Sequence, residues 1–350
     1  MPPHYGLCVA RLPRPLIRRP ISVTLVTVTA LLVLVLSPVV APLLLIADLV
    51  TGHRRGRRVR VWFLIGATVW CEFIGMLAAS ALALWFVGGR RDPARYLDHN
   101  YRLEFWWCRR HLANLGRFAG VTVDMPDPSP LGGSRSIVIS RHSSHVDAIV
   151  PLIVLGRIGR LPRYTLKEDL KWAPAMDLVG DRTPNVWINR APALGSPMFE
   201  QIEQLAATMP DDASCVIFPE GTFRTPERHT RSIERLARTR PDLARRADRL
   251  RYVLPPRPAG TQALLRGAPD ADVVVLANVG TENLSSIAEI IDTITEPHPI
   301  VVHATRHERA TVPDDPDAFA EWLVERWLEM DDWIHDRVTE GLPMIATKTA

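Results

Sequence analysis

The chain has 350 residues, of which 47% are hydrophobic and 23% are charged, and its formal net charge is +4 at neutral pH. This balance excludes a disordered chain, and the length suffices for one large domain with an additional module. The mild positive charge is compatible with an anionic membrane surface or a phosphorylated substrate, although many other proteins share it. The cysteines are scattered, so they indicate neither a zinc site nor a disulfide framework and favour a reduced, intracellular catalytic portion; they are Cys8, Cys71, Cys108 and Cys215.

Two apolar runs near the N-terminus predict a helical hairpin in the membrane. Residues 21–47 are uncharged, and as a helix they would be roughly 40 Å long, more than the ~30 Å of a bilayer core. Pro38 and Pro42 predict a kink in this helix. Residues 61–89 form the second run, whose one charge, Glu72, we expect to face the partner helix or the lipid headgroups.

Three arginine clusters flank this hairpin and leave its topology open. Two full spans would put one cluster outside the cell, against the preference of arginine for the cytoplasmic side. A hairpin that does not cross the bilayer would keep all three clusters on the cytoplasmic face. The clusters are Arg11, Arg14, Arg18 and Arg19; Arg54, Arg55, Arg57, Arg58 and Arg60; and Arg90, Arg91 and Arg95.

Beyond residue 92, short apolar runs alternate with helical patterns. This alternation predicts an α/β fold with a mixed, mostly buried central sheet flanked by helices and preceded by the N-terminal membrane hairpin. We therefore expect two parts, residues 1–92 with the basic segment and hairpin, and residues 93–350 with the catalytic domain. The expected strands are 121–125, 136–140, 185–189, 214–218, 272–279 and 300–305, and the expected helices are 93–118, 147–158, 195–209, 231–251 and 317–338.

The segment "SRHSSHVDA", residues 140–148, follows a predicted buried strand and precedes a predicted helix. In α/β proteins this position displays reactive side chains. Asp147 can accept the Nδ1 proton of His142, which fixes the tautomer and leaves Nε2 free as a general base. This pair is the predicted catalytic unit, with a substrate alcohol in the place of a protein nucleophile.

Three further segments at strand ends carry candidate substrate ligands. In "VIFPEGTFRT", Glu220 can hold a hydroxyl, Gly221 permits close backbone approach, and Arg224 can clamp a phosphate beside Thr222. In "VWINR" a strand ends at Arg190, which is a second candidate phosphate ligand. The remaining candidates are Arg257, in the proline-framed loop "VLPPRPAG", and Lys167, which could contact phosphate or be merely solvated.

Together these segments resemble the glycerolipid acyltransferase family of the lysophosphatidic acid acyltransferase type. The family signatures His-x₄-Asp, Asn/Asp-Arg and Phe-Pro-Glu-Gly-Thr-Arg are matched by "HSSHVD", "WINR" and "FPEGTFR". "VLPPRPAG" is similar to the Leu-Pro-Arg-x-x-Gly form of the lysocardiolipin acyltransferase branch, and "YTLKEDLKWAPAMDLVG" resembles the segment before the second signature. The resemblance covers roughly residues 100–340. The sequence departs from the pattern at Phe223, where the family usually has arginine, and at Asn189, where aspartate is common.

The resemblance implies acyl transfer from acyl-CoA or acyl carrier protein to a glycerolipid hydroxyl, 1-acylglycerol-3-phosphate being the favoured acceptor. His142 would take the hydroxyl proton, Asp147 would orient His142, and the substrate would be held by Arg190, Glu220, Gly221, Thr222, Arg224, Arg257 and Lys167. No metal, no bound cofactor and no nucleic acid partner is expected, and the protein would work at the cell membrane with its site on the cytoplasmic face.

Two alternatives come from other functional classes. One is a membrane-anchored lipid-binding scaffold with a dead site, against which the presence of His142, Asp147 and Glu220 argues. The other is a metal-dependent hydrolase using His142, His145 and Asp147, whose spacing resembles that of metal ligands.

Overall fold

The computed structural model describes residues 13–52, 56–144, 146–188, 197–282, 294 and 296–340. Its strands are β1 (Val121–Asp124), β2 (Ser136–Ser140), β3 (Leu161–Lys167), β4 (Val186–Ile188), β5 (Ala213–Ile217), β6 (Asp272–Val279) and β7 (His298–His307). Its α-helices are α1 (Pro15–Val50), α2 (Arg57–Trp85), α3 (Pro93–Ala119), α4 (Ile149–Arg157), α5 (Pro174–Gly180), α6 (Pro197–Ala207), α7 (Pro226–Ala237), α8 (Pro241–Ala247), α9 (Pro258–Gly267) and α11 (Pro316–Thr339). Short 3-10 helices are η1 (Ser129–Leu131), η2 (Val146–Ala148), η3 (Glu168–Trp172) and η5 (Arg309–Thr311).

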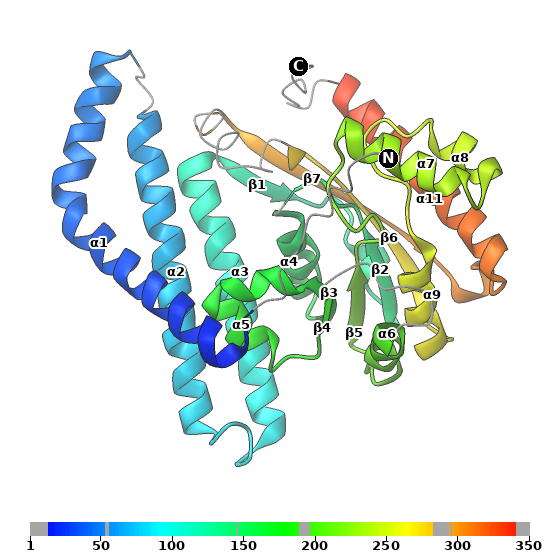
Figure 1. Cartoon of the computed structure of the whole chain (residues 1–350), viewed down its shortest axis with the longest axis horizontal. Helices are drawn as coiled ribbons and strands as arrows, with labels where there is room; N and C mark the ends of the chain where they lie inside the picture. The colour runs from blue at the N-terminus through cyan, green and yellow to red at the C-terminus, as the bar shows by residue number, and fades with distance from the viewer. Residues whose placement is uncertain are drawn as a thin grey trace, which may run out of the picture.

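The strands form one seven-stranded sheet of order β1-β7-β6-β2-β5-β3-β4. Its mixed character and its helices confirm the predicted α/β fold. Strands β6, β2, β5, β3 and β4 are parallel neighbours, whereas β7 runs antiparallel to β6. Helices α3, α4 and α5 lie on one side of the sheet, and α6, α9 and α11 lie on the other (Figure 1). The carboxyl ends of the parallel strands therefore meet at one edge between two helical layers.

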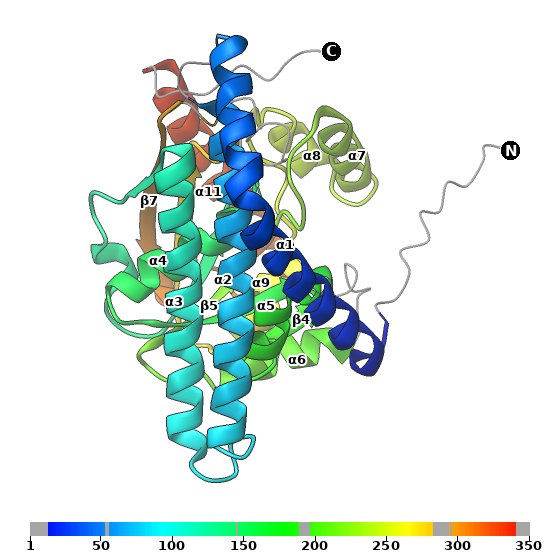
Figure 2. The same ribbon diagram turned by 90° about the vertical axis from the view of Figure 1, so that its left-hand side faces the viewer.

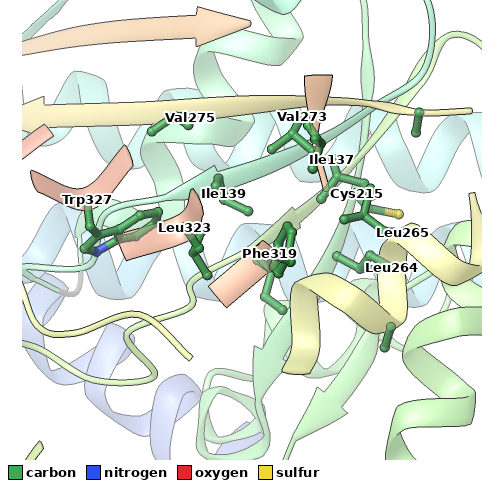
Figure 3. Close-up of a cluster of buried hydrophobic side chains, with 14 of the residues drawn as sticks. Ile137, Ile139, Cys215, Leu264, Leu265, Val273, Val275, Phe319, Leu323 and Trp327 are labelled. Atoms are coloured by element: carbon green, nitrogen blue, oxygen red, sulfur yellow. The ribbon is translucent and has the colours of Figure 1, made fainter. Parts of the chain in front are cut away.

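The central strands are apolar on both faces because both faces are covered. Ile137 and Ile139 of β2 belong to one core cluster, whereas Val138 between them belongs to the cluster on the opposite face. Figure 3 shows the first cluster, in which side chains from β2, β5 and β6 meet α9 and Phe319 and Trp327 of α11. These continuous apolar runs explain why the sequence revealed the central strands.

The structure differs from the sequence-based expectation in four places. Strand β3 and helices α5 and α9 were not predicted, and the single helix expected over residues 231–251 is two helices, α7 and α8. Pro241 is the first residue of α8, and proline disfavours helical conformation in the residue before it, so the chain breaks after α7.

The N-terminal hairpin is present, and both of its helices are long and apolar enough to cross a membrane. α1 is bent (Figure 1), and it contains Pro38 and Pro42, each of which removes a backbone donor from the helix. α2 packs along α3 (Figure 2), from Arg60, whose guanidinium reaches the carbonyl of Phe118, to Phe86, whose ring lies 5.7 Å from that of Tyr96. One face of α2 is therefore covered by the domain over the length of the helix.

Glu72 contacts α3 and α5, whereas the sequence-based expectation placed it against the partner helix of the hairpin or the lipid headgroups. Its Oε1 accepts a hydrogen bond from Trp107 Nε1 of α3 at 3.0 Å. Its Oε2 accepts one from the backbone N–H of Ala175 at 3.3 Å, in the first turn of α5. A carboxylate is favourable there because it meets the positive end of the helix dipole. The contact attaches α2 to the α/β domain.

A buried ion pair attaches α1 to α5 as well. Arg18 Nη2 lies 2.7 Å from Asp177 Oδ1, and both side chains are buried. Arg19 bonds the second oxygen of the same carboxylate at 2.9 Å. Two arginines that the sequence offered as topology signals thus serve to dock the first helix onto the domain.

Candidate active site

Neighbouring strands bring the candidate residues to one edge of the sheet. His142 follows β2, Glu220 follows β5, Lys167 ends β3, and Asn278 lies near the end of β6. Because the strands run in the order β6-β2-β5-β3 and are parallel, these four residues come from adjacent carboxyl ends. This edge is where open α/β sheets form their sites.

His142 and Asp147 face one another across the turn after β2. His142 Nδ1 lies 3.7 Å from Asp147 Oδ2, which is a charge-pair distance and longer than a hydrogen bond. The same oxygen accepts the backbone N–H groups of Ser143 and, at 2.6 Å, of Ser144. Oδ1 accepts a hydrogen bond from Asn278 Nδ2 at 2.7 Å. Both carboxylate oxygens are thus fixed, one of them toward the imidazole.

Asp147 is fully buried and still favours its charged form. Burial acts to raise its pKa, but the His142 imidazole, the Ser144 N–H and the Arg141 guanidinium outweigh burial and lower the pKa below its ordinary value. Asp147 is therefore ionised at neutral pH and is placed to stabilise a positive imidazolium at His142.

Glu220 connects two loops of the site. Its Oε1 accepts the backbone N–H of His142 and its Oε2 that of Leu254, both at 2.9 Å. Burial raises the pKa of Glu220 to about 8, although these two N–H donors and Arg141 oppose the rise. Both oxygens are engaged within the protein, so contact of Glu220 with a substrate hydroxyl stays a prediction, and the geometry instead gives it the task of holding His142 in place.

Two aromatic rings flank the imidazole. The ring centroid of Phe218 lies 4.9 Å from that of His142, and Phe223 meets the imidazole edge to face at 4.6 Å. Lys167 Nζ lies 5.6 Å from the centroid of the Phe223 ring, in a cation–π contact. Phe223, the departure from the family pattern, therefore covers the candidate base with an apolar wall.

Cationic side chains surround this wall. Arg257 donates its backbone N–H to Pro219 O at 3.0 Å, and its guanidinium lies about where a side chain on Gly221 would point, 3.5 Å from that position. Gly221 has φ of 71°, a conformation that glycine adopts without strain. Partial desolvation, and then the charges of Arg228 and Arg257, lower the pKa of Lys167. The site is therefore electropositive.

The structure describes two of the remaining predicted ligands, Thr222 and Arg224. Thr222 is partly buried in the loop after Gly221. Arg224 is half-buried, and burial lowers its pKa while the charge of Asp331 of α11 opposes the shift. Arg190 and His145 lie outside the described residues.

Two residues of the site escaped the sequence-based interpretation. Asn278 holds Asp147, and Arg141 is buried beside it, donating to Asn278 O at 2.5 Å and to Tyr252 O at 3.1 Å. A polar residue inside the apolar run "DVVVLANV", and a charge directly after "SIVIS", were the available signals. Neither says which partner it meets, because the partners are distant in sequence.

Within the described part of the chain, no group of three or more His, Cys, Asp or Glu side chains is positioned to hold a metal ion. The hydrolase alternative needs His145, whose position is not described.

Comparisons with known proteins find similarity to acyltransferases. Residues 120–257 match the family model described as Acyltransferase. The chain is 25% identical over 246 residues to lysocardiolipin acyltransferase 1 of Danio rerio, which covers 69% of this chain and 62% of that protein. It is 26% identical over 261 residues to 1-acyl-sn-glycerol-3-phosphate acyltransferase epsilon of Mus musculus, covering 71% and 70% of the two chains.

A solved structure shares the fold. The 1-acyl-sn-glycerophosphate (LPA) acyltransferase PlsC from Thermotoga maritima superposes with a TM-score of 0.52 at 14% sequence identity. The match covers 83% of this chain and 100% of that one.

Proposed function

We propose that the protein transfers a fatty acyl group from an acyl thioester to a hydroxyl of a lysophospholipid or glycerol phosphate, because residues 120–257 match the Acyltransferase family model. 1-Acylglycerol-3-phosphate is the favoured acceptor, and acyl-CoA or acyl carrier protein is the donor. The observation that carries the proposal is the pairing of His142 with the buried, ionised Asp147 at the carboxyl edge of the sheet.

The reaction begins with the acceptor hydroxyl at His142. Nδ1 faces Asp147, so Nε2 is the nitrogen available as a base. It takes the hydroxyl proton as the oxygen attacks the thioester carbonyl carbon, and Asp147 stabilises the imidazolium that forms. The tetrahedral intermediate then collapses, the carbon–sulfur bond breaks, and the imidazolium returns the proton to the departing thiolate. An ester and a free thiol result.

The surrounding residues position these partners. Glu220 holds the backbone of His142, and the Phe218 and Phe223 rings exclude water from the imidazole, which limits thioester hydrolysis. Lys167 and Arg257 supply positive charge for the acceptor phosphate. We also assign Arg190, Arg224 and Thr222 to substrate binding, on the resemblance of their segments to the family motifs.

The apolar surface of the N-terminal helices supports the proposal that the protein acts at a membrane. α1 exposes many large apolar side chains, among them Leu25, Val35, Leu43 and Leu49. α2 is held against α3 and α5 by contacts such as that of Glu72 with Trp107, so we infer that the hairpin lies against the domain and enters the lipid with its free face. With this arrangement all three arginine clusters stay on one side, which we take to be the cytoplasmic side.

An acceptor screen tests the proposal. Purified protein in mixed micelles receives oleoyl-CoA or oleoyl-acyl carrier protein together with a panel of lysophospholipids and glycerol 3-phosphate, and lipid mass spectrometry reads the products. Formation of a diacyl lipid that survives a metal chelator supports the proposal. Activity abolished by the chelator, or lipid binding with no turnover on any acceptor, contradicts it.

A further inference from the structure

Helix α7 carries a row of arginines on one face. Arg228, Arg231, Arg235 and Arg238 follow one another at intervals of three, four and three residues, which places them on the same side of a helix. All four are exposed. The opposite side of α7 packs against the core through Ile233 and Leu236. We call these four residues the α7 arginine row.

The α7 arginine row forms no ion pair in the described part of the chain. No carboxylate there lies within 4.0 Å of these four guanidinium groups, although the charge of Glu227, which accepts a hydrogen bond from Thr225, acts on Arg228 and Arg231 from a longer distance. Arginines just beyond the row are different, since Arg240 pairs with acidic side chains of α8 and α11 and Arg251 with those of α11. Like charges in a row repel one another and favour a polyanionic ligand.

The row begins at the candidate active site. Arg228 donates to the carbonyl of Phe223 at 3.1 Å, and the ring of Phe223 touches the imidazole of His142. Farther along, Arg235 is close enough to Arg257 that its charge adds to the effect of burial in lowering the pKa of Arg257. The positive charges thus continue from the reaction centre outward along α7.

From this arrangement we infer that the α7 arginine row binds the phosphate groups of a coenzyme A thioester, which assigns the acyl donor as acyl-CoA. The inference rests on the proposed acyl transfer. The row spans about 15 Å, ten residues at the helical rise. The pantetheine arm, with peptide-like bonds and two amide units, spans on the order of 15 Å when extended. A thioester at His142 therefore leaves the diphosphate and 3′-phosphate beside the outer arginines.

Two other polyanions could bind such a row, an anionic bilayer surface and an acyl carrier protein, and both fit the structure less well than coenzyme A. α7 and α8 lie on the side of the sheet away from α1 and α2 (Figure 1), so the row is separated from the apolar helices that we expect to enter the bilayer. Glu227 and Glu234 adjoin the row on α7. They would repel the extended acidic surface of an acyl carrier protein, whereas a compact phosphate can bind between arginines.

Donor truncation tests the inference. Initial rates are measured with oleoyl-CoA, oleoyl-pantetheine and oleoyl-acyl carrier protein for the wild type and for the double variant Arg231→Ala/Arg235→Ala. The expected result is a rise of about tenfold or more in KM for oleoyl-CoA, the scale of one lost charge-assisted hydrogen bond, with kcat nearly unchanged. The kinetics with oleoyl-pantetheine should not change, and adenosine 3′,5′-bisphosphate should compete with oleoyl-CoA in the wild type much more strongly than in the variant.

A matched control loses the same charge elsewhere. Arg266→Ala/Arg337→Ala removes two exposed arginines from α9 and α11, each with a surface ion pair of little energetic worth, and should keep the wild-type KM. Equal KM values for oleoyl-CoA and oleoyl-pantetheine in the wild type would overturn the inference while leaving acyl transfer intact. So would a defect seen only with acyl carrier protein, or one that follows the anionic lipid content for every donor. No transfer from any donor would instead refute the proposed function.

Discussion

The turn after β2 and the loop after β5 each bury one carboxyl group close to His142, and the pKa values of these two groups are shifted in opposite directions. Asp147 accepts three N–H donors and faces the imidazole, and its pKa is lowered. Glu220 accepts two backbone N–H donors, and burial raises its pKa to about 8. Burial alone favours the protonated acid, so the additional donor and the imidazole distinguish Asp147.

This difference assigns separate tasks to the two groups. Asp147 supplies the fixed negative charge that an imidazolium needs. Glu220 holds two loops in register, and near neutral pH it exchanges between charged and neutral forms. Pairs of carboxyl groups whose environments push their pKa values apart are a familiar mark of acid–base sites.

Of the changes to these two carboxyl groups and their partners, removal of the charge at Asp147 should lower kcat the most. Asp147→Asn keeps the size of the side chain but loses the negative charge that stabilises the imidazolium. We expect kcat to fall by about 10²–10⁴ with the fold retained, as for the orienting aspartate of serine-enzyme triads. Steady-state kinetics and circular dichroism measure both. Near-wild-type kcat would show that the two carboxylates do not differ in role.

A smaller effect is expected at Asn278, which fixes Asp147 from β6. Asn278→Leu removes the hydrogen bond to Oδ1 and should lower kcat by about tenfold with KM unchanged, because Asp147 stays charged but is less well oriented. Asn278→Asp should be impaired increasingly as pH rises, because its carboxyl can donate to Asp147 only while protonated. A loss in Asn278→Asp that is constant across pH would indicate a structural role alone.

At Glu220 the expected effect is on the pH dependence of stability. Its pKa in the folded state is raised above the ordinary value of 4.5, so the stabilisation associated with it is fully present below pH 4.5 and is lost as pH rises through about 8. Glu220→Gln does not titrate and should show a flatter dependence over this range. Urea midpoints at several pH values between 4.5 and 8 measure this, with Glu203→Gln, an exposed surface acid, as the control. Parallel curves for wild type and Glu220→Gln would contradict the raised pKa.

The sequence predicted the parts of this molecule that local patterns encode. The apolar runs of β2, β5 and β6 indicated a sheet covered on both faces, and the spacing of His142 and Asp147 indicated a base with its orienting acid. Strand β3 was missed because it contains polar residues that are buried in the structure although their type suggests exposure. Arg163, for example, is buried and donates a hydrogen bond to the carbonyl of Leu205. α9 begins in a segment with Pro258 and Gly260, which read as a loop.

Local sequence patterns could not predict contacts between residues that are distant in sequence. Asn278 meets Asp147 across 131 positions, and Arg18 meets Asp177 across 159. Each residue is visible in the sequence as an unusual polar group, but only the strand order and the packing of α1 on α5 decide what it bonds.

We expect the His142 imidazole to remove the acceptor proton, and single-turnover transfer from labelled acyl-CoA by His142→Ala measures whether it does. We predict a rate lower by several orders of magnitude, on the scale seen when the base of a catalytic triad is removed, in a protein with the wild-type circular dichroism spectrum and lipid binding. Transfer at the wild-type rate by a well-folded His142→Ala protein would show that the His142 imidazole is not the base.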